Sequence, residues 1–274
     1  RPLEPYIASI DTLVIIPDGL LRTIPFAALY DGKQYLIEKK ALATTVALSL
    51  LTQEEASTIS SPLERTILLN GVSEGEIGLP YPVSEVEAIA ALYPHEKLFN
   101  DTFTKSNFLG KLEAKPYSVI HIASHGQFKS SFKDSFIHTI DSKKPLDMND
   151  LKKIARWGTY RDQMVELLTL SACESATGNE QATLGLSGIA VRAGAKTAVG
   201  SLWRVSDLST CYLMESFYRH LKDSQFSGKA KALQQAQLQL LKGEVGQGTS
   251  ACQKSSPEEV EKYRQPYYWS GFLV

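Results

Sequence analysis

The stretch that decides the fold is Glu166-Leu167-Leu168-Thr169-Leu170-Ser171-Ala172-Cys173-Glu174-Ser175-Ala176-Thr177-Gly178. Its apolar run predicts a buried strand that ends abruptly at small residues, and Cys173 lies where this strand gives way to a loop. A second stretch, residues 117–126, has the same design, because a β-branched run ends at His125 and Gly126 follows. In open parallel α/β sheets, ligands and chemistry collect outside the carboxyl ends of the strands. If the two strands are neighbours, His125 and Cys173 face each other across one crevice, as a thiol nucleophile and its base would.

From Arg65 onward, strand patterns alternate with helix patterns. This alternation predicts an α/β fold with a mostly parallel sheet flanked by helices. One strand–helix–strand unit separates His125 from Cys173, so the two strand ends are expected side by side. The first 62 residues look different and predict a small β-rich N-terminal region. We therefore expect two parts, 1–62 and 63–274, with the boundary at the polar segment Ser57–Pro62.

Local signals predict several further elements. The sequence Ser84-Glu85-Val86-Glu87 is typical of a capping box that opens a helix, and Asp207 is typical of a helix N-cap. The segment Leu20–Leu29 is expected to form an irregular or edge strand, because it contains a proline. Tyr35–Glu38 follows a hairpin signal and is expected to be a strand, as is the chain end Tyr267–Val274.

Composition limits the classes of function. The chain has 274 residues, of which 43% are hydrophobic, and 29 basic residues balance 30 acidic ones for a net charge of −1. Such a balance predicts no nucleic-acid or membrane partner. No apolar run approaches the roughly 18 residues of a membrane span, and no signal peptide is evident. Since the chain lacks an initiator methionine, we expect a fragment of a longer protein.

The three cysteines are widely spaced and odd in number. This pattern favours a reducing, cytoplasmic setting over a disulfide framework, and no paired spacing indicates zinc or another metal or cofactor. Cys211 within a helix and Cys252 in a loop are expected to be packing or surface thiols. Considered by itself, Cys173 could be a small buried hydrophobic residue, which is the commonest role of a free cysteine. Its place beyond the apolar run, flanked by Ala172 and Glu174, instead favours a nucleophile.

Among the five histidines, His125 is the candidate base because the adjacent glycine lets the backbone approach a ligand closely. An imidazole beside Cys173 would lower the pKa of its thiol and favour thiolate at neutral pH. The amides of Gly126 and Cys173 could then polarise a carbonyl as an oxyanion hole. His121 is expected to be a buried core histidine on the same strand face as His125. The remaining three are expected to be solvated: His95, His138 and His220.

Asp207 is the third residue of interest, because it follows the strand predicted over residues 197–203. It could be a plain helix N-cap, or a carboxylate that holds a basic substrate side chain by a charge-assisted bond. The two roles are compatible because a carboxylate has two oxygens. Glu174 is an alternative substrate-binding residue.

Further motifs are spread over nearly the whole chain. They are Ile16-Pro17-Asp18-Gly19-Leu20 with Ile24-Pro25-Phe26-Ala27-Ala28-Leu29, Leu79-Pro80 with Glu85-Val86-Glu87-Ala88-Ile89, Ile122-Ala123-Ser124-His125-Gly126, Leu170-Ser171-Ala172-Cys173, Ala193-Gly194-Ala195 with Ser201-Leu202-Trp203-Arg204-Val205-Ser206-Asp207, and Pro266-Tyr267-Tyr268-Trp269-Ser270-Gly271-Phe272. Together they resemble the CHAT domain, a caspase-like peptidase module found with tetratricopeptide-repeat regions, especially in bacteria.

The resemblance implies a caspase-like fold and a cysteine endopeptidase with His125 and Cys173 as its catalytic dyad. It also implies a peptide substrate, no cofactor and a tetratricopeptide-repeat region in the same full-length protein. By analogy with the Trp-x-Val-x-Asp stretch of separase, Asp207 would favour a basic residue before the cleaved bond. Selection of aspartate, as in caspases, would need several converging arginines, and only Arg204 is near.

Two other interpretations stay open. The chain could be a regulated or latent interaction module whose dyad is silent until a partner binds. It could also be a serine hydrolase or a nucleotide-binding α/β protein. Against the latter, Gly185-Leu186-Ser187-Gly188 is no G-x-S-x-G elbow, and neither a G-x-G-x-x-G motif nor a Walker loop occurs.

Overall fold

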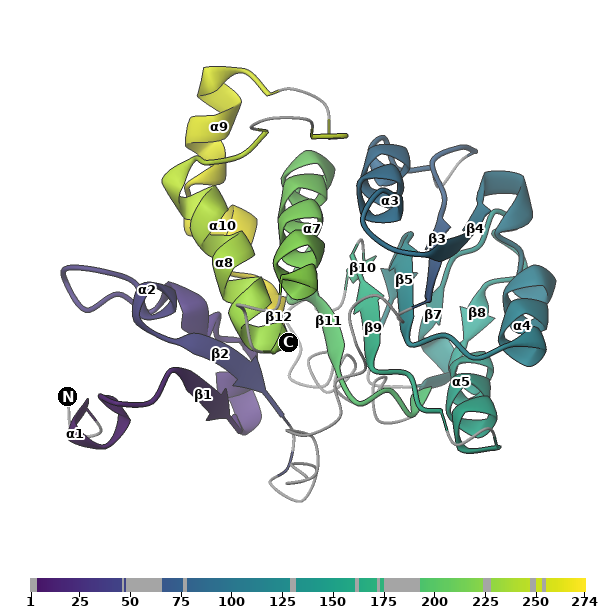
Figure 1. Cartoon of the computed structure of the whole chain (residues 1–274), viewed down its shortest axis with the longest axis horizontal. Coiled ribbons are helices and arrows are strands. Elements are labelled where there is room, and N and C mark those ends of the chain that lie inside the picture. Colours follow the sequence, from purple (N-terminus) through teal and green to yellow (C-terminus); the bar gives the residue numbers. More distant parts are fainter. Residues whose placement is uncertain are drawn as a thin grey trace.

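A computed structural model describes the central sheet and the helices around it (Figure 1). The described residues are 4–45, 47, 66–75, 78–128, 132–160, 163–171, 173–174, 193–223, 228–246, 250–252 and 255–274, without the side chains of 132, 155, 158–160, 173 and 174. Residues 183–193, whose apolar stripe predicts a helix, lie largely outside this described part.

The central sheet has the strand order β12-β11-β9-β5-β3-β4. Its strands are β3 (Ile67–Gly71), β4 (His95–Phe99), β5 (Val119–Ala123), β9 (Leu167–Leu170), β11 (Ala198–Ser201) and β12 (Phe272–Leu273). All neighbours are parallel except β11 and β12, which are antiparallel. The predicted α/β class is confirmed, and the architecture is consistent with a caspase-like fold.

Helices cover both faces of this sheet (Figure 1). The core on one face includes side chains of α3 (Pro82–Ala90), α7 (Asp207–Lys222) and α8 (Lys229–Lys242). On the other face the core includes side chains of α4 (Lys105–Ala114) and α5 (Met148–Tyr160). Successive strand residues alternate between the two cores, which is the period-2 pattern of a sheet buried on both sides. In the described part of the chain, no helix is long and apolar enough to cross a membrane.

A second, smaller sheet has the order β10-β6-β7-β8. Its strands are β6 (Gly126–Gln127), β7 (Phe136–Ile137), β8 (Leu146–Asp147) and β10 (Cys173–Glu174). The segment 132–147 thus contributes the two short antiparallel strands β7 and β8 and the 3-10 turn η7 (Phe132–Asp134).

The N-terminal region contains α1 (Glu4–Ile7) and the parallel pair β1 (Thr12–Ile15) and β2 (Ala41–Thr44). Two predicted strands are wrong. The segment Leu20–Leu29 forms the 3-10 turns η1 (Gly19–Thr23) and η2 (Phe26–Ala28) instead of a strand. In place of the strand predicted at Tyr35–Glu38, the structure has the short helix α2 (Leu36–Lys39). The Glu38 carboxylate accepts a hydrogen bond from the Tyr35 backbone N–H at 2.6 Å, which closes this helical turn.

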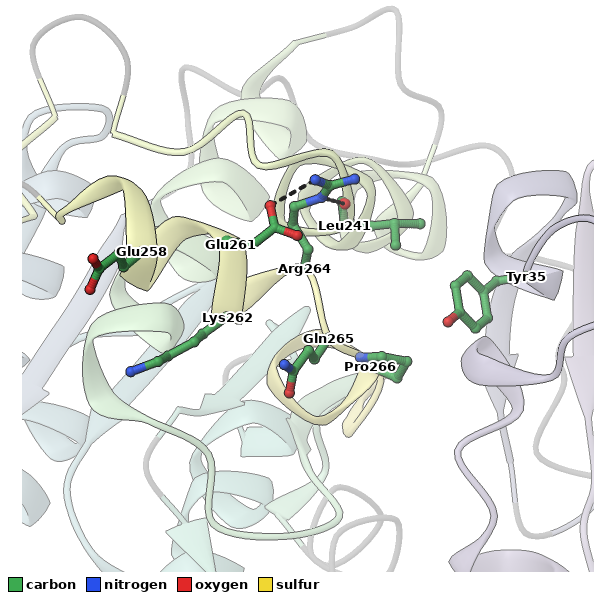
Figure 2. Close-up of a pocket in the computed structure, with 8 residues that line it drawn as sticks. All are labelled: Tyr35, Leu241, Glu258, Glu261, Lys262, Arg264, Gln265 and Pro266. Carbon is green, nitrogen blue, oxygen red and sulfur yellow. Dashed lines mark hydrogen bonds and ion pairs between the residues drawn. The ribbon is translucent and has the colours of Figure 1, made fainter.

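The N-terminal region packs against α8 and the chain end. Gln234 Nε2 donates to the Ile37 carbonyl at 2.7 Å, and the Thr44 N–H donates to the Val274 carbonyl at 2.7 Å. The predicted final strand is confirmed only at β12, because Pro266 begins the helix α10 (Pro266–Trp269) after α9 (Pro257–Tyr263). A cleft of about 430 Å³ lies between Tyr35 and the α9–α10 segment (Figure 2). None of its lining residues is a predicted site residue.

A buried polar cluster links the sheet to α3 and α7. Glu85 Oε1 lies 2.8 Å from His121 Nε2, although the two atoms are not aligned for a hydrogen bond. The other ring nitrogen, His121 Nδ1, lies 3.2 Å from the Tyr218 hydroxyl, which donates to Thr169 Oγ1 at 2.9 Å. All four residues are buried, as predicted for His121.

The capping box predicted at Ser84–Glu87 is wrong. Helix α3 begins earlier, with Tyr81 as N-cap and Pro82 in the first turn, so Ser84 lies inside the helix and caps nothing. Proline is well suited to this position because it has no N–H to leave unpaired. Because the helix begins earlier, Glu85 lies on its inner face and its side chain reaches His121.

The expectation of unpaired cysteines is also wrong, because Cys211 and Cys252 form a disulfide across 41 residues of sequence. Both residues are buried. Ser250 next to Cys252 donates through its hydroxyl to Glu215 Oε2 at 2.5 Å, so the segment 250–252 lies against α7. Sequence spacing could not reveal this pair, because the contact depends on how the chain returns to α7.

We expect Glu85→Ala to lower the free energy of unfolding by about 3–5 kcal/mol, since it leaves His121 buried without its acidic partner. Urea unfolding would measure this change. The matched control is Glu87→Ala in the same helix. Its ion pair with Lys97 is exposed, so we expect a loss below about 1 kcal/mol. Equal losses in both variants would contradict a special role for the buried cluster.

The double variant Cys211→Ala/Cys252→Ala is expected to lose about 4 kcal/mol of stability by the chain-entropy model for a loop of this length. Reduction of the wild type should lower its urea midpoint to a similar level, whereas the double variant should not respond to reductant. Alkylation of the unfolded, unreduced wild type should modify one cysteine per chain. Modification of all three would show that the disulfide is absent.

Candidate active site

The strands that carry the predicted nucleophile and base are neighbours. β5 and β9 are parallel, with Val119 opposite Leu167 and Ile122 opposite Leu170. The Ser171 N–H continues this pairing by donating to the Ile122 carbonyl at 3.1 Å. The predicted adjacency of the two strands is therefore confirmed.

Beyond these strands the pairing resumes with a shifted register. β6 and β10 are also parallel, with Gly126 opposite Cys173 and Gln127 opposite Glu174. Three residues separate Ile122 from Gly126, but only two separate Leu170 from Cys173. The histidine side therefore has one residue more, as in a β-bulge, and such bulges commonly re-aim side chains beside active sites. As a result Gly126, rather than His125, lies directly opposite Cys173.

His125 occupies this shifted segment and is half-buried. Its carbonyl accepts a hydrogen bond from the His138 N–H at 2.8 Å, and the Ser124 hydroxyl donates to the His138 carbonyl at 2.8 Å. The backbone of Cys173 is described, but its side chain and that of Glu174 lie outside the described atoms. The predicted pairing of the imidazole with the thiol, and the substrate-binding role of Glu174, therefore stay predictions.

The expectation that three histidines are solvated holds only for His95, which is exposed at the start of β4. His138 and His220 are half-buried, and burial lowers the pKa of each imidazole. The His138 ring packs edge-on against Phe136, with ring centroids 4.9 Å apart. Its position beside His125 was missed because the sequence pattern around His138 predicted no strand there. Within the described ranges, no group of three or more His, Cys, Asp and Glu side chains is arranged to hold a metal ion.

Asp207 is the first helical residue of α7, and Ser206 is the N-cap, with no side-chain cap. The predicted N-cap role of Asp207 is therefore wrong. Its side chain is half-buried. Burial raises the pKa of the Asp207 carboxyl, the nearby Arg204 opposes this rise, and the negative charge of Glu85 adds to it. Two acidic groups thus share the region where α3 and α7 pack together.

The segment that leads into Asp207 is held by the end of the chain. The rings of Trp203 and Tyr267 stack with centroids 6.1 Å apart, and Trp203 Nε1 donates to the Tyr267 carbonyl at 3.0 Å. The Tyr267 hydroxyl donates to the Arg204 carbonyl at 2.7 Å. A Cβ at Gly271 would lie 2.8 Å from the Trp203 ring, so only glycine fits beneath it. These contacts position the Trp-x-Val-x-Asp segment relative to β11.

Two comparisons with known proteins bear on the family of this chain. The family model described as the CHAT domain matches residues 1–274, the whole chain. A search of curated proteins found no significant match. The chain belongs to the CHAT domain family.

Proposed function

We propose that this domain is a cysteine endopeptidase in which Cys173 is the nucleophile and His125 the general base and acid. The observation that carries the proposal is the register of β6 and β10, because Gly126 lies opposite Cys173 and His125 precedes it. Membership in a caspase-like peptidase family adds support. Since Cys211 and Cys252 are paired, Cys173 is the one cysteine outside the disulfide.

The proposed reaction proceeds through an acyl-enzyme. The Cys173 thiolate attacks the scissile carbonyl carbon, and the amides of Gly126 and Cys173 hold the resulting oxyanion. The C–N bond then breaks, and the imidazolium of His125 gives its proton to the leaving amine. In the second half, His125 takes a proton from water as the oxygen attacks the thioester. Collapse returns the carboxylic acid and the thiol.

A basic residue before the cleaved bond suits the charges around Asp207. Its half-buried carboxylate lies in the field of Glu85, and the positive charge of Arg204 offsets that field. A substrate guanidinium could form a bidentate, charge-assisted pair with Asp207. An aspartate side chain would instead meet negative charge. Glu174 remains the alternative residue for this contact.

A partner-regulated module is the second candidate. Eight of the eleven exposed large apolar side chains in the described residues lie between positions 6 and 30. They are Tyr6, Ile10, Val14, Ile16, Leu20, Leu21, Leu29 and Tyr30. Gathering of apolar groups in one region is typical of surfaces that meet another protein surface. This candidate differs from the first in expecting peptide cleavage only after another protein segment, such as a tetratricopeptide-repeat region, is added.

We expect an arginine-containing peptidyl electrophile to label one site per chain in the wild type. Labelling should disappear in Cys173→Ala and fall strongly in His125→Ala, because the thiolate population then decreases. Intact-protein mass spectrometry would measure the stoichiometry, with the disulfide-free double variant as a control. Undiminished labelling in Cys173→Ala would refute the assignment of the nucleophile.

Asp207→Asn tests the choice of substrate. Because Asp207 does not cap α7, the change should leave the urea midpoint nearly unaltered. Loss of a charge-assisted bond should lower kcat/KM for an arginine peptide about 10–100-fold. Alkylation of Cys173 by a small reagent should survive. Asp101→Asn, at an exposed position, is the control. If arginine-peptide turnover is unchanged in Asp207→Asn, selection lies elsewhere, and Glu174 is the next residue to test.

A further inference from the structure

His138 lies directly across a β-ladder from His125. In the antiparallel pair β6–β7, Gly126 is opposite Ile137, so the next pair along the ladder is His125 with His138. The His138 N–H donates to the His125 carbonyl at 2.8 Å, which identifies the two as a hydrogen-bonded pair. Side chains of such a pair project from the same face of the ladder, with Cβ atoms about 5 Å apart.

The imidazole of His138 carries an unexplained polar atom. Its Nδ1 is buried and has no hydrogen-bond partner among the residues that the structure describes. Such atoms are rare in folded proteins, and each calls for a specific explanation. The contact with Phe136 fixes the ring from the same strand. Burial lowers the pKa of this imidazole, so the ring is neutral at neutral pH and keeps one nitrogen that can accept a proton donor.

We propose that His138 is a positioning residue for the reaction, whose unpaired ring nitrogen accepts an N–H of His125 once His125 has taken the thiol proton. The proposal rests on the proposed dyad. When the proton leaves Cys173 Sγ, the His125 imidazolium has two N–H donors. One faces the thiolate, and the other is held by His138. The contact stabilises the thiolate–imidazolium pair without any change in the number of protons.

The charges around His138 are compatible with a neutral acceptor. On β8, Asp147 already pairs with Lys105 at 3.3 Å. On the other side, His125 precedes β6, and β10 beyond that strand carries Cys173 and Glu174. Lys133 and Asp134 precede β7 and are exposed. A protonated His138 would instead repel the His125 imidazolium. The proposed contact therefore requires that the pKa of the His138 imidazole be low enough for the ring to be neutral.

A purely structural role for the His138 side chain makes a different prediction. The hydrogen bonds that join His138 to Ser124 and His125 use only its backbone N–H and carbonyl. His138→Leu therefore keeps these bonds and fills a similar volume, while removing the ring nitrogens. His138→Gln keeps a polar side chain that can accept a hydrogen bond. If the His138 side chain served in packing alone, Cys173 in His138→Leu would be at least as reactive as in His138→Gln.

The test is the pH profile of Cys173 alkylation by iodoacetamide, followed by mass spectrometry on the folded, disulfide-bonded protein. We expect His138→Leu to raise the apparent pKa of the Cys173 thiol by about one unit, equivalent to a tenfold loss of thiolate near neutral pH. His138→Gln should recover most of this loss. The exposed-histidine control His95→Leu should match the wild type. Turnover of an arginine peptide at pH 7 should follow the same order, with kcat changing more than KM.

Three results would overturn the inference. In the first, His125→Ala shifts the alkylation profile but His138→Leu does not, so the dyad stands and His138 is not part of it. In the second, His138→Gln is as impaired as His138→Leu, so the ring nitrogen is not the cause. If His125→Ala itself leaves the profile unchanged, the proposed dyad falls, and this inference falls with it. Should the leucine variant fail to fold, the glutamine variant alone must still resemble the wild type.

Discussion

The contact between Glu85 and His121 is the constraint on which the arrangement of the predicted site depends. It joins α3 to the middle of β5, and Tyr218 extends it to β9 and α7. Each connected element leads to a predicted site residue: β5 to His125, β9 to Cys173, and α7 from Asp207. Buried polar groups left without partners are costly, so this cluster favours one arrangement of sheet and helices over others of similar packing.

Beyond this cluster, one additional residue between β5 and β6 changes which residue lies opposite Cys173. A continuous ladder would set His125 against Cys173, whereas the observed register sets Gly126 there. Gly126 is buried, and as a glycine it places no Cβ beside the backbone of the cysteine. The short strand β6 is held on both sides, by β10 and by β7, so the segment after His125 is fixed by the sheet itself.

A covalent constraint also acts on α7. The disulfide joins Cys211, one turn after Asp207, to the segment that follows α8. The expectation of a reducing setting rested on unpaired cysteines and loses that support. A peptidase of this design would need Cys173 as a free thiol while Cys211 and Cys252 stay oxidised. Assays with reductant should therefore follow both the labelling of Cys173 and the state of the disulfide.

The sequence by itself determined the α/β class and the adjacency of the strands that lead to His125 and Cys173. These follow from local periodicity and from the short right-handed connections of parallel strands. Only the tertiary structure decided that Glu85 points inward, that Asp207 is not a cap and that Cys211 meets Cys252. It alone also decided that His138 lies opposite His125. Each of these depends on contacts between distant segments or on a shift of one residue in register. Such contacts leave no periodic signal in the sequence, because their energy comes from the packing of elements rather than from the preference of any one element.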